Sequence, residues 1–260
     1  AISAAKREGL ATAVLVGDEA RIKSIAKEAE LDIDGLRIVN EPDNLAAVKK
    51  AVTMVGSGEA DVLMKGLVGT ADLLRGVLNK DWGLSTGKTI SYVGIIDSPE
   101  YDRLLFLTDP AIATYPDLKM KIDLINNAVQ VARALGVDQP KVACVTAVEV
   151  VNPKMEATMD AALLAKMSDR GQIRNCIVDG PLALDNALSE ESARHKGIVS
   201  PVAGKADILL VHNIETGNAL FKSAHYLADC ETAGFTVGAS VPIVITSRAD
   251  TAQTKFNSIA

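Results

Sequence analysis

The chain alternates short, strongly apolar runs with longer segments of helical spacing, and few folds accept such an alternation. The apolar runs have the length and β-branched content of buried strands, and lie at residues 12–18, 36–40, 61–66, 141–148, 174–180, 206–213 and 241–246. Helical spacing occupies residues 19–30, 43–55, 70–79, 118–136 and 248–259. Strands that alternate with helices predict an α/β fold with mostly parallel sheets. Nearly continuous apolar strands predict that both faces of the sheet are covered.

One region interrupts the alternation. Residues 88–109 predict two antiparallel strands with a turn at Ser98-Pro99. We take this region as the border between two α/β domains, the first formed by residues 1–90 with 236–260 and the second by residues 91–235. The chain opens without a methionine on "AISAAKREGL", which is typical of the tail of a helix. We therefore expect further residues upstream, with a first strand among them.

Composition excludes several classes of protein. The 260 residues carry a net charge of −6 and no cluster of Lys or Arg, which is unfavourable for nucleic-acid binding. The three cysteines form no CxxC pair and lie far apart, at Cys144, Cys176 and Cys230, as in a reduced cytosolic protein. The three histidines have no metal-ligand spacing. No apolar run approaches the ~20 residues of a membrane span, and no signal peptide is evident. We expect a cytoplasmic protein without a metal.

Polar residues gather at the C-terminal ends of the predicted strands. Ligands of open α/β sheets bind at this edge. The alternative is that polar loops simply begin where strands end, but seven such residues together favour a ligand cleft. They are Asp18, Lys65, Asp109, Asp179, His212, Asn213 and Ser247.

Ser247, Arg248 and Asp250 follow the last predicted strand at once. A serine N-cap with a carboxylate three residues later resembles a capping box, which is a purely structural interpretation. Arg248 fits that role poorly, because a cation in the first helical turn opposes the positive end of the helix dipole. Free amides, the dipole and a guanidinium fork would together bind a phosphate. A salt bridge between Arg248 and Asp250 remains the alternative.

Lys65 ends a second apolar run, in "DVLMKGLVG". A lysine at the end of a buried strand is costly unless it is paired. Gly66 and Gly69 flank the turn, and Thr70 can cap the next helix. The turn suits an anion, although the Walker A pattern is missing. A lysine–carboxylate pair is the competing interpretation.

Two further stretches carry weaker signals. In "VDGPLALDNA", Asp179-Gly180-Pro181 closes a strand with proline at a helix start, and Asp185 follows one turn later. Capping aspartates explain this stretch equally well. In "IETGNALFK", Asn218 and Lys222 stand at the mouth of a helix.

The ordered set of motifs is more specific than any one of them. The set comprises "DVLMKG", "VNPKMEATMDAALLAKMSDRGQI", "VDGPLALDNA", "SPVAGKADILL", "IETGNALFK" and "SRAD". Together they resemble the phosphotransacylase family, the phosphate acetyl- and butyryltransferases, over nearly the whole chain. "VDGPLALDNA" is closer to the butyryltransferase branch than to the acetyltransferase branch. The resemblance implies a two-domain αβα architecture of the isocitrate/isopropylmalate dehydrogenase-like fold, with an active site in the interdomain cleft.

The resemblance also implies a reaction: a short-chain or branched acyl-CoA plus phosphate gives acyl phosphate plus CoA, reversibly. It implies a homodimer, coenzyme A as substrate or product, and no tightly bound cofactor. Arg248 would bind the phosphoryl group, and Ser247 would hydrogen-bond the thiol sulfur or the developing oxyanion. In the acetyl branch a carboxylate further along the helix is the proposed base. Its counterpart here is Thr254, which cannot serve, so Asp250 is the nearest candidate.

The remaining candidates are residues that would bind the substrate. They are Lys65, Thr70, Asp109, Asp179, Asn218 and Lys222.

Three other functions remain open at this point. A dehydrogenase of related fold would use NAD(P), but no GxGxxG follows a strand. A non-catalytic sensor of phosphate or acyl-CoA would bind its ligand without turnover. An acyltransferase that uses acyl carrier protein would need a basic docking patch, which the net charge of −6 does not suggest.

Overall fold

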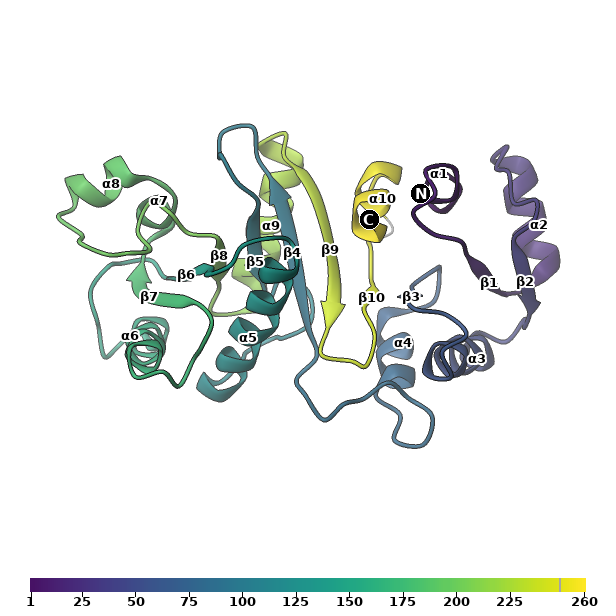
Figure 1. Ribbon diagram of the computed structural model, residues 1–260, viewed down its shortest axis with the longest axis horizontal. Helices are drawn as coiled ribbons and strands as arrows, with labels where there is room; N and C mark the ends of the chain where they lie inside the picture. The colour runs from purple at the N-terminus through teal and green to yellow at the C-terminus, as the bar shows by residue number, and fades with distance from the viewer. Residues whose placement is uncertain (248) are drawn as a thin grey trace. The chain divides into compact units, whose positions relative to one another are not determined.

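The computed structural model describes residues 1–247 and 249–260, and these form two compact units (Figure 1). Unit 1 comprises residues 1–88 and 233–260, and unit 2 comprises residues 89–232. Both units contain strands and helices in alternation, so the predicted α/β class is confirmed.

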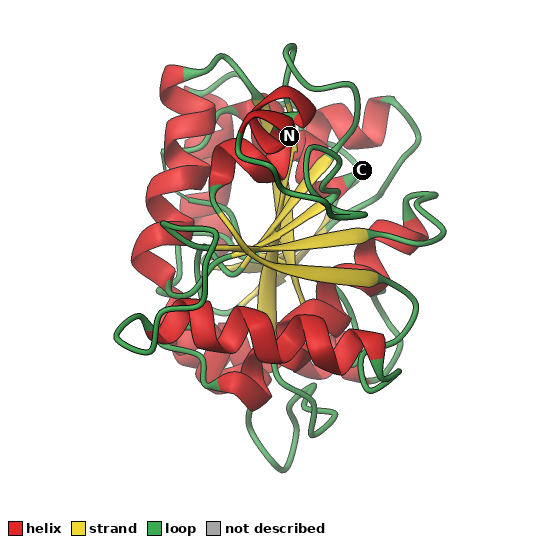
Figure 2. Ribbon diagram, turned by 90° about the vertical axis from the view of Figure 1, so that its left-hand side faces the viewer, coloured by secondary structure: helices red, strands yellow, loops and turns green. Residues whose placement is uncertain are grey.

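Unit 2 is built around a five-stranded part of a sheet in the order β4-β5-β8-β6-β7. β4 runs antiparallel to β5, as the sequence of residues 88–109 predicts, while the other neighbours are parallel. Figure 2, which faces unit 2, shows these strands between helices on both faces. The elements are β4 (Ser91–Asp97), β5 (Leu105–Thr108), α5 (Leu118–Ala134), β6 (Lys141–Val145), α6 (Glu156–Asp169), β7 (Ile177–Leu182), α7 (Leu184–Leu188), α8 (Glu190–His195), β8 (Ile208–Leu210) and α9 (Ile214–Leu227).

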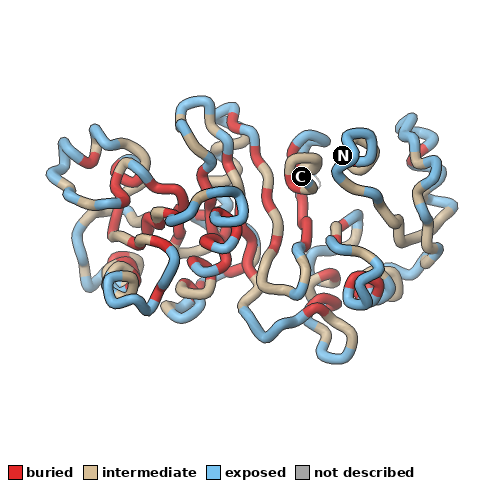
Figure 3. The backbone as a smooth tube through the Cα atoms, in the orientation of Figure 1, coloured by how far each residue is buried: buried red, intermediate tan, exposed pale blue. Residues whose placement is uncertain are grey.

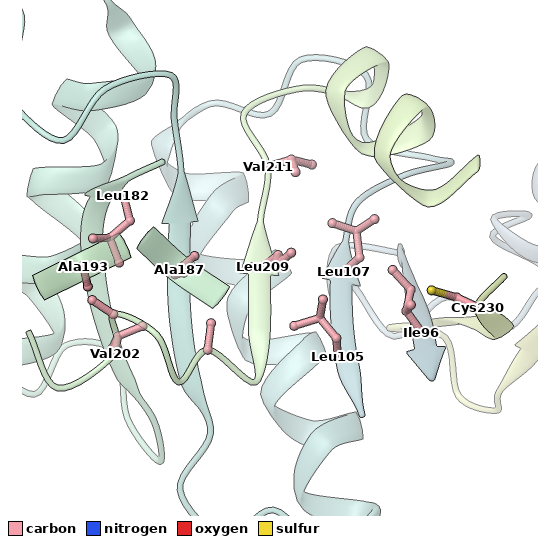
Figure 4. Packing of buried hydrophobic residues seen from close by; sticks show 13 residues of the cluster. Ile96, Leu105, Leu107, Leu182, Ala187, Ala193, Val202, Leu209, Val211 and Cys230 are labelled. Atoms are coloured by element: carbon pink, nitrogen blue, oxygen red, sulfur yellow. The ribbon is translucent and has the colours of Figure 1, made fainter. Parts of the chain in front are cut away.

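Successive strand residues of unit 2 point to opposite faces of the sheet and form two cores. Leu107, Leu209 and Ala143 stand in one row of the register and pack with α7, α8 and α9 (Figure 4). The next row contains Thr108, Leu210 and Cys144, which by alternation faces α5 and α6. β5 and β8 are buried throughout (Figure 3). Both faces are therefore covered, as the apolar strands predict.

Unit 1 has a small parallel sheet and a second set of paired strands. β1 pairs with β2 in parallel, and β10 lies between β3, its parallel partner, and β9, its antiparallel partner. Strand β9 contains the border between the units. The elements are α1 (Ile2–Arg7), β1 (Val14–Gly17), α2 (Glu19–Glu28), β2 (Arg37–Asn40), α3 (Asn44–Gly56), β3 (Leu63–Met64), α4 (Thr70–Val77), β9 (Glu231–Val237), β10 (Ile243–Val244) and α10 (Ala252–Ile259).

Side-chain caps explain where many of these helices begin. Asp18, Asp43 and Asp117 each accept the backbone N–H three residues ahead, at the starts of α2, α3 and α5. Asn213 does the same for α9. Asp18 and Asn213 end predicted strands, and in both cases the side chain caps a helix.

Three expectations about element boundaries are wrong. The last helix begins at Ala252, with Thr251 as its N-cap, and not at residue 248. Pro181 does not start a helix, because β7 continues to Leu182 and α7 begins at Leu184. Thr70 does not cap α4, because Gly69 is the N-cap and Thr70 is the first helical residue.

Strand β9 was not expected from the sequence. Its inward positions are Thr232, Gly234 and Thr236, which alternate with half-exposed residues. Small and polar residues on the buried face give no apolar signal, so a period of two is not visible from hydrophobicity.

Candidate active site

The ends of β3 and β10 bring two of the sequence motifs together in unit 1. Leu63 pairs with Ile243 and Met64 with Val244, in parallel register. The backbone N–H of Lys65 then donates to the carbonyl of Val244 at 2.9 Å. Lys65 therefore lies beside the segment that leads into Ser247, although 182 residues separate them in sequence (247 − 65).

Lys65 is buried at this edge, with 8% of its surface exposed. Its Nζ donates to the carbonyls of Gly66 at 3.1 Å and Val68 at 3.3 Å. These carbonyls belong to the glycine-rich turn, so the ammonium organises the loop that joins β3 to α4. Such contacts offset part of the desolvation cost of a buried cation. Thr70 is exposed at the start of α4, at the end of this loop.

Two hydrogen bonds join Ser247 and Asp250 ahead of α10. The Ser247 N–H donates to Asp250 Oδ2 at 2.6 Å, and the Asp250 N–H donates to the Ser247 carbonyl at 3.2 Å. Ser247 Oγ accepts the Ala249 N–H at 3.3 Å. Arg248 lies outside the described residues. Asp250 is thus hydrogen-bonded to the exposed Ser247 through both its side chain and its backbone.

Thr254 belongs to the cap of α10. Its N–H donates to Thr251 Oγ1 at 3.0 Å, and the two hydroxyl oxygens are also 3.0 Å apart. Thr254 is buried, and its hydroxyl contributes to the start of this helix.

Asp109 stands at the end of β5 in unit 2, with 2% of its surface exposed. Its Oδ2 accepts the Tyr92 N–H at 2.8 Å. Its Oδ1 accepts the N–H groups of Ala111 at 2.7 Å and Ile112 at 2.8 Å. Burial raises the pKa of Asp109, and the backbone hydrogen bonds oppose that rise. The carboxylate holds the loop after β5 to the start of β4.

Asn218 and Lys222 lie four residues apart on α9, and therefore share a face of this helix. Asn218 Nδ2 donates to the carbonyl of Pro110 at 3.1 Å, which ties α9 to the loop that Asp109 shapes. Lys222 Nζ lies 5.9 Å from the centre of the Tyr226 ring. Asp109 and Asn218 thus both hold the loop that contains Pro110.

Asp179 occupies the middle of β7 and is half-buried. Its Oδ1 accepts the N–H of Gly180 at 2.8 Å. The neighbouring Asp185 is engaged elsewhere, since its carboxylate lies 2.9 Å from Lys196 Nζ. Lys196 also donates to Glu149 at 2.6 Å, so Asp185 and Lys196 belong to an ion-pair network.

Sequence reasoning missed a buried polar cluster beneath the carboxyl edge of the unit 2 sheet. Lys121 Nζ donates to Asp160 Oδ2 at 2.5 Å and lies 2.8 Å from His212 Nδ1. Lys121 is 2% exposed. The signal was present in the sequence, because Lys121 has the helical spacing of the buried Leu124, Ile125 and Ala128 of α5.

Two negative findings concern residues 1–247 and 249–260. Within these ranges, no group of three or more His, Cys, Asp or Glu side chains could hold a metal ion. In the same ranges, no helix has both the length and the apolar character needed to cross a membrane.

Comparisons with known proteins give the family. A family model described as phosphate acetyl/butaryl transferase matches residues 43–260. Phosphate butyryltransferase from Clostridium acetobutylicum is 58% identical over 260 residues, which is 100% of this chain and 86% of that relative. A solved branched-chain phosphotransacylase from Enterococcus faecalis V583 has a TM-score of 0.83 and 32% identity, and the match covers 95% of each chain.

The chain is therefore an acyltransferase, and it belongs to the phosphate acetyl/butaryl transferase family. The resemblance drawn from the six sequence stretches is confirmed. A putative 4-hydroxythreonine-4-phosphate dehydrogenase from Salmonella typhimurium shares the fold, with a TM-score of 0.60 at 12% identity over 99% of this chain and 92% of that one. The expected likeness to a dehydrogenase fold is thereby confirmed, and at this identity it extends to the fold alone.

Proposed function

We propose that this protein transfers a short-chain or branched acyl group between the thiol of coenzyme A and inorganic phosphate. A phosphate oxygen attacks the thioester carbonyl carbon, a C–O bond forms and the C–S bond breaks. The proton that leaves the attacking phosphate ends on the sulfur. The products are acyl phosphate and free CoA, and the same steps run in reverse. The observation that carries this proposal is the 58% identity to a phosphate butyryltransferase along the whole chain.

The geometry of unit 1 supports an anion site at the edge formed by β3 and β10. The buried ammonium of Lys65 and its glycine-rich loop lie at this edge, and β10 leads from it to Ser247 and Asp250. Arg248 supplies the guanidinium that binds the phosphoryl oxygens. Ser247 Oγ accepts the Ala249 N–H, which leaves its own hydrogen to donate to the sulfur or the oxyanion.

The proton transfer is assigned to Asp250. Its carboxylate already orients Ser247 through the Ser247 N–H, so one side chain would both shape the turn and accept the proton. Lys65 and Thr70 are proposed substrate-binding residues. Asn218, Lys222 and Asp179 are further proposed substrate-binding residues, and Asp109 would contribute by fixing the loop that Asn218 contacts.

The names of the relatives indicate which acyl group the protein transfers. Phosphate butyryltransferase and branched-chain phosphotransacylase both act on acyl groups larger than acetyl, so we propose butyryl or a branched short acyl group. We further propose a cytoplasmic homodimer that needs no tightly bound cofactor. Light scattering on the purified protein tests the dimer, since a mass close to the 27.3 kDa of one chain would exclude it.

The decisive variant is Arg248→Ala, with Arg75→Ala as its control. Arg75 is an exposed arginine of unit 1 whose guanidinium lies 2.9 Å from Asp72. With butyryl-CoA and phosphate, we expect Arg248→Ala to reduce thiol release by about 100-fold or more, and Arg75→Ala to leave it unchanged. Equal rates in both variants would remove Arg248 from the mechanism. Binding of both substrates without turnover by the wild type would favour a sensor, and reduction of NAD(P) a dehydrogenase.

A further inference from the structure

His212 belongs to the buried cluster that the proposed chemistry has not used. It follows β8 by two residues and precedes Asn213, the N-cap of α9. Its Nδ1 lies 2.8 Å from Lys121 Nζ, and Lys121 also contacts Asp160 at 2.5 Å. Two helices on one face of the sheet, α5 and α6, thus hold a side chain at the end of a strand.

The contact with Lys121 determines which nitrogen of His212 carries the proton. A lysine ammonium only donates hydrogen bonds, so the nitrogen it faces must accept one. Nδ1 is therefore unprotonated, and a neutral imidazole then carries its hydrogen on Nε2. The buried lysine fixes a single tautomer of His212.

The surroundings also disfavour the charged form of the ring. Burial and then the charge of Lys121 lower the pKa of His212, and the carboxylates of Asp160 and Glu156 on α6 oppose them. The remaining titratable neighbour in the cluster is Cys144 on β6, and burial raises the pKa of its thiol well above the usual range. A neutral donor at this place resembles the neutral histidines that polarise carbonyl groups in other enzymes.

Two side chains of the cluster, His212 and Asp160, are partly exposed. The cavity at its centre measures about 10 Å³ and is lined by Lys121, Cys144, Asp160, Leu210 and His212 among others. No substrate fits in that space. His212 is partly exposed and so is the Asp160 side chain, at 13%, whereas Lys121 is 2% exposed. A carboxylate only accepts hydrogen bonds, so His212 is the partly exposed member of the cluster that can donate one to a ligand. It stands at the carboxyl edge of the sheet, where ligands of such folds bind.

We propose that His212 donates its Nε2–H to an oxygen of the substrate, either of the phosphoryl group or of the thioester carbonyl, and that Lys121 and Asp160 are positioning residues which hold this tautomer. The proposal rests on the proposed function for the identity of the substrate. The assignment of the tautomer does not depend on it.

Two substitutions distinguish the roles of the two ring nitrogens of His212. Asparagine places a polar atom where imidazole has Nδ1, and glutamine where it has Nε2. We expect His212→Asn to keep the partner of Lys121 and hence the Tm, but to reduce kcat/KM about tenfold or more. We expect His212→Gln to retain more activity than His212→Asn while lowering the Tm, because the buried Lys121 loses its acceptor.

A matched control is available on α8. His195 is 70% exposed and lies 4.0 Å from Glu191, so His195→Asn should change neither the Tm nor kcat/KM. If His212→Asn keeps the wild-type kcat/KM, or if His212→Gln is the less active of the two, the role of Nε2 is overturned.

Nitrogen NMR on protein with ¹⁵N-labelled histidine tests the tautomer without using activity. The chain has three histidines, so His195→Asn and His212→Asn assign the spectrum. We expect His212 to show a protonated Nε2 and a bare Nδ1 at neutral pH, and the Nε2 resonance to shift with phosphate or with butyryl-CoA. The ligand that causes the larger shift identifies the oxygen.

The NMR result also separates this proposal from the proposed function. Wild-type protein that releases no thiol but whose Nε2 resonance still shifts with phosphate would contradict the transferase reaction and retain the His212 site. A protonated Nδ1, or an Nε2 resonance that neither ligand moves, would overturn the His212 site whatever the activity. In Lys121→Met with Asp160→Asn, which removes both charges beside the ring, we expect His212 to become a mixture of tautomers.

Discussion

Asp109 and Lys121 are both almost fully buried ionisable residues of unit 2, and the structure satisfies them in different ways. Asp109 accepts three backbone N–H groups and so fixes the course of a loop. Lys121 donates to two side chains and so fixes the orientation of one of them. At the scale of the residue, the buried carboxylate of Asp109 thus determines the shape of a loop, whereas the buried ammonium of Lys121 determines the orientation of a neighbouring side chain.

Asp250 has two proposed roles, which are to accept the Ser247 N–H and to accept a proton during catalysis. Asp250→Asn retains an oxygen that can accept the Ser247 N–H, so we expect the free energy of unfolding to change by less than about 1 kcal/mol. The amide cannot take a proton, so we expect kcat to fall about 100-fold or more. Urea titration and thiol release measure the two quantities. An unchanged kcat would restrict Asp250 to shaping the turn.

His212 makes the stability of the chain depend on pH in a defined direction. Because burial and Lys121 lower its pKa in the folded state, the unfolded chain takes up the proton at a higher pH. The stabilising contribution is present above the ordinary histidine pKa of about 6.5 and is lost as the pH falls through the lowered value.

We therefore expect the free energy of unfolding to decrease more steeply from about pH 7.5 to 5 in the wild type than in His212→Asn. Urea titrations at several pH values in this range give both slopes. Parallel slopes would show that the protonation of His212 is not coupled to folding.

At the scale of the element, α9 depends on a glycine in its first turn. A Cβ on Gly217 would lie 2.7 Å from the Asp109 carbonyl oxygen and 2.9 Å from Pro110 Cα. Both neighbours are backbone atoms, so neither can move aside cheaply. The glycine of "IETGNALFK" allows α9 to approach the loop after β5, and Asn218 then reaches Pro110.

We expect Gly217→Ala to lower the free energy of unfolding by about 1–3 kcal/mol, as overpacking does. Gly56→Ala is the control, because Gly56 ends α3 and an added Cβ there meets only Leu84 at 3.5 Å. Thermal and urea unfolding of the two variants give the comparison. Equal stability in both would show that α9 shifts to accept the methyl group.

The sequence predicts elements well where burial and apolar character coincide. The runs at 36–40, 118–136 and 141–148 correspond to β2, α5 and β6 within a few residues. β9 has no such signal, because threonine and glycine occupy its inward positions. The start of α10 was placed too early, because Ser247 and Asp250 have the spacing of a capping box but form a separate turn.

At the scale of the whole molecule, the sequence identifies the family, but contacts between distant residues decide which strand-end polar residues are available to a ligand. Asp18 and Asn213 are helix caps and Asp109 binds backbone amides, although all three follow predicted strands. Local sequence cannot distinguish a cap from a ligand contact, since both require the same residue types. The Lys121 cluster joins α5, α6 and the end of β8, and no local pattern contains all three.

The most direct test of the central claim is a product balance. Purified protein is incubated with butyryl-CoA and phosphate, acyl phosphate is measured by ³¹P NMR, and free thiol is measured in the same samples. We expect one acyl phosphate for each thiol released, no release when phosphate is omitted, and faster turnover of butyryl-CoA or isobutyryl-CoA than of acetyl-CoA. Thiol release that is independent of phosphate, or that forms no acyl phosphate, would contradict the assigned reaction.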